Sequence, residues 1–199
     1  MTEPIERPGG RTSRVRHAVL RAAGDALAES GFPALDLAEV ARRAGVGKTT
    51  VYRRWGNVPA LVADLLAEMA EESVARTETG TLLGDLEANA LLVQQTLTDP
   101  RQGRLFRAVI AAASCDERTA AALQRFYDMR IAEWVPCVEA ALRRGEVPEG
   151  TDPTTVIMAV SAPLYYRLLT RTEPPTRADA LTAARSAVAA ATAGAFVPL

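Results

Sequence analysis

Residues 36–57 read DLAEVARRAGVGKTTVYRRWGN and predict two short helices joined by a tight turn. In the first half, small apolar residues recur at helical spacing, and Gly45 supplies the backbone freedom that a sharp turn between helices requires. In the second half, Val51 and Trp55 can pack against the first helix, so the polar side chains around them face outward. This layout is typical of a helix-turn-helix, whose second helix enters the major groove of DNA.

The outward-facing side chains of the second helix suit contacts with duplex DNA. Lysine and arginine donate to guanine or to phosphate, threonine offers a hydroxyl and a methyl group, and tyrosine donates to phosphate. We therefore expect the DNA contacts to come from this helix and the residues after it: Lys48, Thr49, Thr50, Tyr52, Arg53, Arg54 and Asn57.

Two other interpretations of this segment compete with DNA binding. Gly47-Lys48-Thr49 resembles the end of a phosphate-binding loop, but that motif requires a glycine where this chain has Arg42, and a preceding strand. The second alternative is a purely structural pair of helices whose basic face is only solvated.

Composition favours an all-helical protein with a basic first third. Alanine occurs 38 times and aromatic residues make up only 5% of the chain. The formal net charge is −1, yet residues 1–60 hold 10 Lys and Arg against 6 Asp and Glu. This asymmetry indicates that the first third meets a polyanion.

The remaining composition excludes several other classes of protein. Cys115 and Cys137 lack metal-ligand spacing and are expected to be reduced, buried thiols in a cytoplasmic protein. The first residues do not form a signal peptide, and the apolar stretch 186–199 is too short to cross a membrane. No Ser/His/Asp or Cys/His group is apparent, so we expect neither an enzyme nor a bound metal or cofactor.

Capping and stop signals divide the chain into about nine helices. Besides the two helices of the hairpin, the expected helices cover residues 12–30, 58–77, 81–97, 100–114, 117–144, 153–170 and 177–195. The expected fold is all-α: a disordered arm over 1–11, a three-helix helix-turn-helix domain over 12–57 and a second helical domain over 58–199. The helix 58–77 connects the two domains.

Two features of the second domain suggest binding functions. Pro136 and Pro163 interrupt the hydrogen bonding of long helices and could hold a cavity open, with an ordinary core as the alternative. The candidate residues of a ligand site are Phe106, Phe126, Arg130, Trp134 and Tyr165. The last two helices are apolar or rich in small residues, as a dimer interface requires, and its candidate residues are Val156, Val160, Leu181, Ala184, Val188 and Ala191.

Residues 14–69, and LAEVARRAGVGKTTVYRRWGNVPALVADLL (37–66) in particular, resemble the DNA-binding region of the TetR family of transcriptional repressors. The rest of the chain resembles that family only in helix count and length. Where the family often has a lysine at the start of the fourth helix, this chain has Val58, and Arg14, Arg16, Arg53 and Arg54 are candidates to replace that phosphate contact.

The resemblance implies a homodimer that reads a palindromic operator in double-stranded DNA and dimerises through its last two helices. It also implies that an unknown small-molecule inducer binds the second domain and releases the DNA. A helical ligand-binding or scaffold protein without operator binding is the alternative from another functional class.

Overall fold

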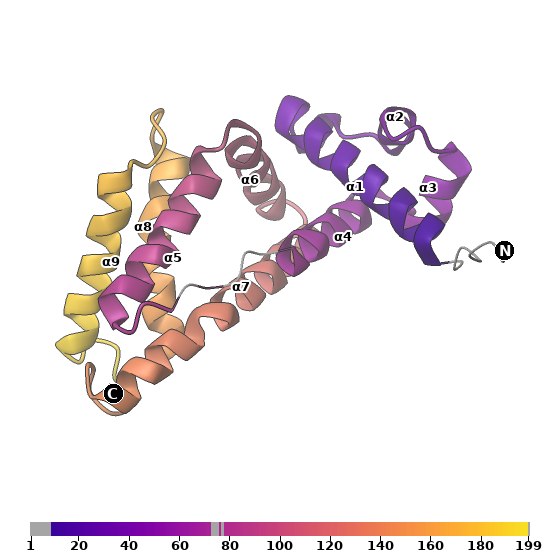
Figure 1. The fold of residues 1–199 in the computed structure, drawn as a ribbon. Helices are drawn as coiled ribbons and strands as arrows, with labels where there is room; N and C mark the ends of the chain where they lie inside the picture. The colour runs from indigo at the N-terminus through magenta and orange to yellow at the C-terminus, as the bar shows by residue number, and fades with distance from the viewer. Residues whose placement is uncertain (1–8, 73–75, 77, 199) are drawn as a thin grey trace, which may run out of the picture. The chain divides into compact units, whose positions relative to one another are not determined.

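The computed structural model describes residues 9–72, 76 and 78–198, and within these residues all regular structure is helical (Figure 1). The helices of the described residues are α1 (Gly9–Ser30), α2 (Leu37–Arg43), α3 (Lys48–Trp55), α4 (Val58–Glu71), α5 (Leu82–Thr98), α6 (Pro100–Ala113), α7 (Glu117–Arg144), α8 (Pro153–Thr170) and α9 (Arg177–Thr192), with a short 3-10 helix at Phe32–Ala34. The predicted all-α fold of about nine helices is confirmed. None of these helices combines the length and apolarity that crossing a membrane would require.

Most helices begin at the side-chain caps that the sequence indicates. In each case a side-chain oxygen accepts a hydrogen bond from a backbone N–H two or three residues later, and the capping residues are Asp36, Asn57, Asp99, Asp152 and Thr176. These bonds satisfy amides that a helix leaves unpaired in its first turn. They explain why the predicted starts of α4, α6, α8 and α9 agree with the structure.

The described residues form two compact units. The first holds the residues up to Glu71 together with Ala108–Gln124, and the second holds Glu72–Arg107 together with the residues from Arg125 onward. The predicted first domain ended at residue 57, whereas α4 groups with the first unit because it packs on α1 and α3.

Two further boundaries differ from the expected ones. The predicted disordered arm covers residues 1–11, but α1 begins at Gly9, and residues 1–8 lie outside the described part of the chain. The connecting helix, predicted over 58–77, ends at Glu71, and residues 73–75 and 77 also lie outside the described part.

The core of the first unit is formed by the apolar faces of α1 to α4. Leu20, Val40, Val51 and Leu61, one from each helix, have no exposed surface. Burial of one such side chain stabilises a fold by roughly 1.5–3 kcal/mol. The short helices α2 and α3 are therefore held by packing on α1 and α4, since helices of this length are marginal alone.

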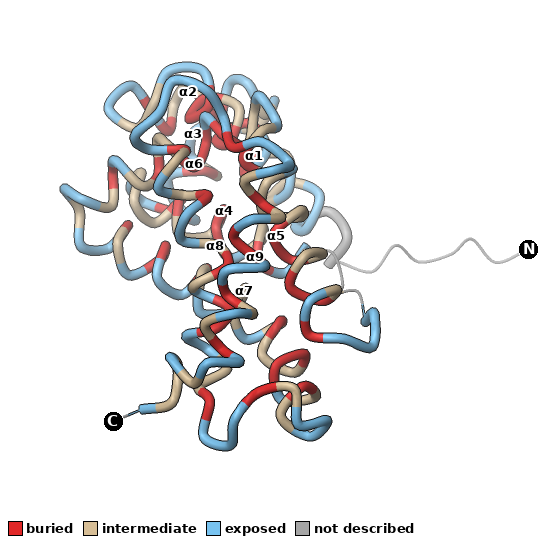
Figure 2. Tube along the Cα trace, turned by 90° about the vertical axis from the view of Figure 1, so that its left-hand side faces the viewer, coloured by how far each residue is buried: buried red, intermediate tan, exposed pale blue. Residues whose placement is uncertain are grey.

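The core of the second unit is built where α5, α8 and α9 lie side by side (Figure 1). Figure 2 shows buried and exposed residues alternating along the helices, as expected for amphipathic helices. On α9 the buried residues are all alanines, which let the backbones approach closely: Ala180, Ala183, Ala184, Ala187 and Ala191.

The two cysteines differ in their environment. Cys137 is buried in α7, as predicted, and remains a free thiol. Cys115 was also expected to be buried, but it is exposed because it lies in the turn between the end of α6 and the start of α7.

Candidate functional sites

The turn between α2 and α3 has the geometry that the glycine predicts. Gly45 has a φ of 65°, and the N–H of Val46 donates to the carbonyl oxygen of Ala41 at 2.9 Å. This arrangement closes a helix with a residue in the left-handed region. Gly47 then caps α3 in an extended conformation with a ψ of 134°. Because a helix and not a strand precedes Gly47, the phosphate-binding-loop interpretation is wrong.

Trp55 anchors the end of α3 to α4. Its ring is only 7% exposed, and its Nε1–H donates to Oδ2 of Asp64 at 2.9 Å. Arg16 of α1 donates to the same carboxylate, with 2.8 Å between Nη2 and Oδ1. We call Arg16, Trp55 and Asp64 the Asp64 network. It joins α1, α3 and α4 at one point and therefore fixes the position of α3 in the unit.

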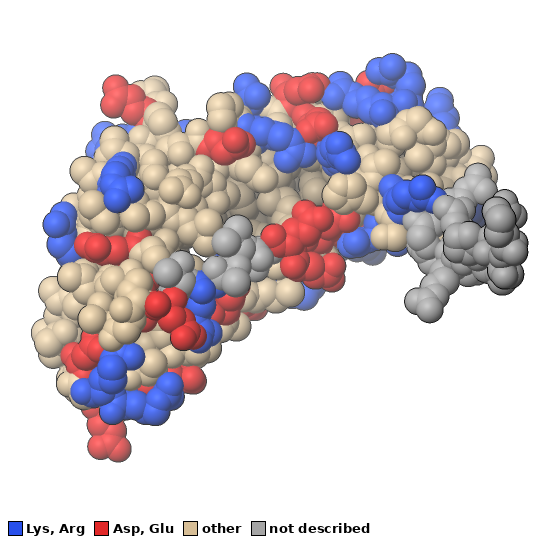
Figure 3. All heavy atoms as spheres, in the orientation of Figure 1, with Lys and Arg blue, Asp and Glu red and all other residues tan. Residues whose placement is uncertain are grey.

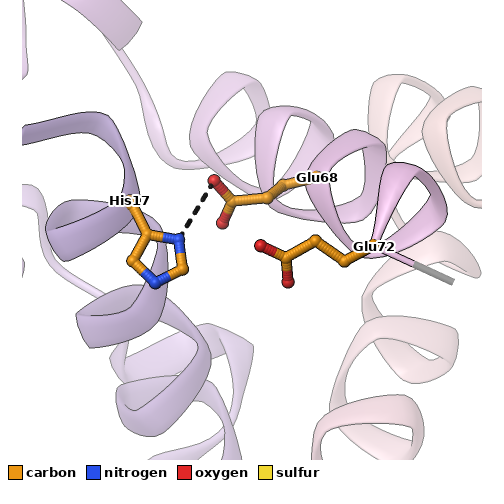
Figure 4. Close-up of side chains that lie close together, drawn as sticks. All are labelled: His17, Glu68 and Glu72. Carbon is orange, nitrogen blue, oxygen red and sulfur yellow. Dashed lines mark ion pairs between the residues drawn. The ribbon is translucent and has the colours of Figure 1, made fainter. Parts of the chain in front are cut away.

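A second carboxylate strengthens the contact between α1 and α4. Arg16 Nη1 lies 3.2 Å from Oε1 of Glu68, and Nδ1 of His17 lies 3.6 Å from the same oxygen (Figure 4). The guanidinium of Arg16 therefore binds two carboxylates within the fold. This makes it unsuited to replace the phosphate contact missing at Val58.

The Asp64 network also affects the titration of its carboxylate. Partial burial raises the pKa of Asp64, but hydrogen bonds from Arg16 and Trp55, with the charges of Arg16 and Arg54, outweigh burial and hold this pKa below its ordinary value. A carboxylate with a lowered pKa stabilises the fold above its unfolded pKa of about 3.9 and loses this contribution as the pH falls through the folded pKa.

We expect Asp64→Asn to lower the free energy of unfolding by about 1–3 kcal/mol at pH 7, since charge-assisted hydrogen bonds are lost. The difference from the wild type should shrink as the pH falls below about 4, where the carboxylate of the unfolded chain becomes protonated, and should vanish only below the lowered pKa of the folded state. Urea denaturation of both proteins across this range measures it. An equal difference at pH 7 and pH 3 would show that the paired carboxylate does not contribute.

The polar side chains of α3 are exposed as the sequence indicates. Lys48, Thr49, Tyr52, Arg53 and Arg54 are exposed, and Thr50 is half-buried. Within the described residues, the side chains of Lys48 and Arg53 have no hydrogen bond or ion pair. Arg54 lies over the ring of Trp55, with 5.2 Å from Cζ to the centroid. Asn57 is exposed, and its Oδ1 caps α4 by accepting from the N–H of Ala60 at 2.9 Å.

The arginines of α2 differ from those of α3 in being paired. On the face drawn in Figure 3, basic side chains gather over α2. Arg42 Nη2 lies 2.6 Å from Oε1 of Glu39, and Arg43 Nη1 lies 2.6 Å from Oε2 of Glu29. Hydrogen bonds from Arg42 and Arg43 lower the pKa of Glu39 to about 2. Of these two helices, α3 therefore presents the basic side chains that are not already neutralised.

In the second unit, the aromatic candidates for a ligand site come together. The ring of Phe106 lies 5.6 Å from that of Phe126 and 6.0 Å from that of Tyr165, between centroids. Tyr127, which sequence reasoning missed, joins this aromatic cluster at 5.3 Å from Tyr165. Its position next to Phe126 on α7 gave no signal, because adjacent residues of a helix do not share a face. Edge-to-face contacts at these distances are favourable.

The other two candidate ligand-site residues, Arg130 and Trp134, come after Phe126 and Tyr127 in α7. Arg130 is half-buried, and its Nη1 lies 2.6 Å from Oε2 of Glu133. Trp134 is 2% exposed. Pro136 lies inside α7, and Pro163 lies inside α8, as predicted. The charge of Arg130 is thus balanced within its own helix.

The predicted dimer-interface residues need correction. Four of the six have no exposed surface within this one chain, and a fully buried side chain cannot contact a second copy: Val156, Val160, Ala184 and Ala191. They pack in the core of α5, α8 and α9. Leu181 and Val188 are partly exposed and stay candidates. The exposed apolar residues of α8 are instead Met158, Tyr166 and Leu169.

Known protein families match both halves of the chain. Residues 19–65 match the family described as bacterial regulatory proteins, tetR family. Residues 76–187 match the tetracyclin repressor-like C-terminal domain, which covers more than half of the chain. The first match contains the α2–α3 hairpin and Asp64, and the second contains the aromatic cluster.

Individual relatives agree with the family matches. The chain is 32% identical over 153 residues to the uncharacterized HTH-type transcriptional regulator YdeS of Bacillus subtilis (strain 168), covering 76% of this chain and 77% of YdeS. It is 31% identical over 163 residues to the HTH-type transcriptional regulator AqdR of Rhodococcus erythropolis, covering 80% of this chain and 78% of AqdR.

A solved structure shows the same architecture. The crystal structure of the TetR family transcription regulator SCO0332 superposes with a TM-score of 0.70 at 27% identity, covering 88% of this chain and 97% of that chain. The relatives named here are transcriptional regulators and not enzymes. With the helix-turn-helix geometry in place, the chain belongs to the TetR family of DNA-binding transcriptional regulators.

Proposed function

We propose that this regulator binds a palindromic operator as a homodimer, inserts α3 of each copy into the major groove and represses transcription until a small molecule binds its second unit. The observation that supports this most is the exposed, unpaired basic surface of α3, held in place by the Asp64 network. The backbone of a helix so anchored does not have to be ordered when it binds DNA, which favours specific binding.

The residues of α3 divide into two roles in this proposal. Lys48 and Arg53 donate to base edges or phosphates, and only the contacts to bases carry sequence information. Thr49, Thr50 and Tyr52 suit phosphate or thymine methyl contacts. No side chain caps the start of α3, so its first backbone N–H groups are also available to a phosphate.

Two arguments support a homodimer: the small area that one hairpin can bury on DNA, and an exposed apolar surface on α8. A single helix-turn-helix buries too little area for tight, specific binding, so two copies are needed to read both halves of a palindrome. On α8, Met158, Tyr166 and Leu169 are 49%, 61% and 47% exposed. This apolar stripe, together with the partly exposed Leu181 and Val188 of α9, is the surface that we assign to the second copy.

Release of DNA by a ligand requires that the protein has two conformations with different affinities for DNA. A ligand at the aromatic cluster would favour one of the two, and its effect cannot exceed its differential affinity for them. Arg130 of α7 lies close enough to Tyr165 of this cluster to act on its hydroxyl electrostatically.

The DNA that flanks the gene of this protein is the first operator to test, by gel shift. We expect Arg53→Ala to weaken operator binding by about 1–3 kcal/mol, the scale of one good base contact, with a smaller effect on random duplex. Arg143→Ala, an exposed arginine at the end of α7, is the matched control and should bind as the wild type does. Equal affinity of Arg53→Ala and wild type for operator would remove Arg53 from the interface.

Operator binding should also depend steeply on salt. Each phosphate contact releases condensed counterions, so we expect the association constant to fall by at least about tenfold between 50 and 200 mM salt. A titration of labelled operator at four salt concentrations measures the slope. A flat dependence would contradict binding through Lys48, Arg53 and Arg54.

A further inference from the structure

Three side chains that can bind a metal ion meet where α1 packs on the end of α4. His17 comes from α1, Glu68 comes from α4, and Glu72 directly follows Glu71, the last residue of α4. One ligand atom from each of the three side chains lies within 4.8 Å of the other two. Figure 4 shows the imidazole and both carboxylates pointing toward one another. Because His17 is far from both glutamates in the sequence, no ligand spacing revealed this group there.

The spacing of the two glutamates places them on one side of α4. Glu68 and Glu72 are four residues apart, so their side chains lie one helical turn from each other. Like charges at this spacing destabilise a helix, and a cation bound between them offsets the repulsion. A divalent ion held by both carboxylates would therefore stabilise the end of α4.

The distance from the imidazole to the nearer carboxylate suits a shared ion. Nδ1 of His17 lies 3.6 Å from Oε1 of Glu68. A good N–H···O hydrogen bond is shorter, at about 2.7–3.2 Å. Two ligands that bind one tetrahedral zinc ion at about 2.0–2.1 Å are about 3.3 Å from each other. The two side chains thus lie near the separation that a common ion imposes.

Arg16 holds Glu68 in place without using up its carboxylate. Nη1 of Arg16 donates to Oε1 of Glu68 at 3.2 Å, and a carboxylate offers about four lone pairs. Hydrogen bonds that orient a ligand side chain are usual around metal sites and strengthen them. The guanidinium also binds Asp64, with 2.8 Å between Nη2 and Oδ1. Because Asp64 balances the charge of Arg16, Glu68 keeps a negative charge to offer an ion.

The ligand types and their exposure indicate the class of ion. The side chain of His17 is 47% exposed and that of Glu68 is 12% exposed, so water can complete the coordination. Three protein ligands with an open position are common in zinc sites. Imidazole suits zinc and similar transition metals, whereas magnesium and calcium prefer oxygen ligands alone.

We propose that His17, Glu68 and Glu72 bind a divalent transition-metal ion, represented by Zn²⁺, with water as the remaining ligand. The ion joins α1 to the end of α4 beside the Asp64 network and stabilises the packing of these two helices. This site needs neither DNA nor a ligand of the second unit, so it goes beyond the proposed function.

The chain carries its own reporter for this site, because His17 is its only histidine. In the 15N-labelled full-length protein, freed of metal with EDTA, we expect Zn²⁺ to shift the imidazole nitrogen resonances and EDTA to reverse the shift. Mg²⁺ at the same concentration should leave them in place. No shift with excess Zn²⁺ would overturn the proposal. An equal response to Mg²⁺ would overturn the transition-metal class.

Two neighbouring glutamates test whether the site is specific. Competition with a chromophoric zinc indicator measures the affinity, and we expect Glu72→Gln to weaken Zn²⁺ binding at least about tenfold. Glu71→Gln makes the same change of charge at the adjacent residue, which is also exposed, and is the matched control. It should bind Zn²⁺ as the wild type does. Equal weakening in both variants would indicate an unspecific acidic surface and overturn the site.

A third variant excludes zinc binding by a thiol. Cys115 is exposed, and thiolates are also good zinc ligands. We expect Cys115→Ser to keep both the Zn²⁺ affinity and the shift of the His17 resonances. Loss of Zn²⁺ binding in this variant would overturn the imidazole site. All these measurements are made without DNA, so their failure would leave the operator-binding function to be decided by gel shift.

Discussion

Replacing Trp55 by alanine is expected to lower the free energy of unfolding by about 3–5 kcal/mol, the range for removing a large aromatic side chain from a core. The ring is 7% exposed, and its loss leaves a cavity under the end of α3. The substitution also removes the hydrogen bond from the indole N–H to Asp64, which joins the last turn of α3 to α4. We therefore expect operator binding to be lost together with stability.

A second substitution separates packing from positioning. Trp55→Phe keeps most of the ring and removes the N–H, so it should cost about 1 kcal/mol and leave α3 folded. Thermal unfolding by far-UV circular dichroism and gel shift should be measured for both variants below their melting temperatures. If Trp55→Ala binds operator as tightly as the wild type, the Asp64 network does not position α3.

Local features of this fold could be predicted from the sequence because they depend on a few neighbouring residues. Asp36 caps α2, Asn57 caps α4, and Gly45 takes the positive φ that ends α2. Each interaction spans five residues or fewer, so the chemistry of the cap or turn is visible in the sequence itself. The exposure of the α3 side chains followed in the same way from the spacing of Val51 and Trp55.

Long-range pairings could not be predicted in this way. Arg16 was a candidate for a phosphate contact, yet it binds Asp64, which is 48 residues away. The helical period also cannot tell which apolar face of α8 is covered by its own chain. Val160 and Met158 are both apolar and two residues apart, but Val160 has no exposed surface and Met158 is 49% exposed. The error in the predicted dimer interface has this origin.

The second large effect is expected from a substitution in the apolar stripe of Met158, Tyr166 and Leu169, which we assign to the dimer interface. A carboxylate placed in the middle of a buried interface has no partner and must lose its hydration, which costs several kcal/mol. We expect Met158→Asp to convert the proposed homodimer to a monomer and to weaken binding to a palindromic operator by at least about 100-fold, because the two hairpins then bind independently. Light scattering after size-exclusion chromatography measures the mass, and gel shift measures the affinity.

The chain provides a closely matched control for this experiment. Met129 on α7 is also 49% exposed, so Met129→Asp makes the same chemical change at the same exposure but outside the apolar stripe. If the stripe is the interface, Met129→Asp stays dimeric and binds operator, whereas Met158→Asp does neither, although both monomers keep their helical content. DNA that holds only half of the palindrome is a further control. One hairpin binds it, so its weak binding should be equal in both variants. A dimer that survives Met158→Asp would place the second copy on another surface and leave the exposed face of α8 without this function.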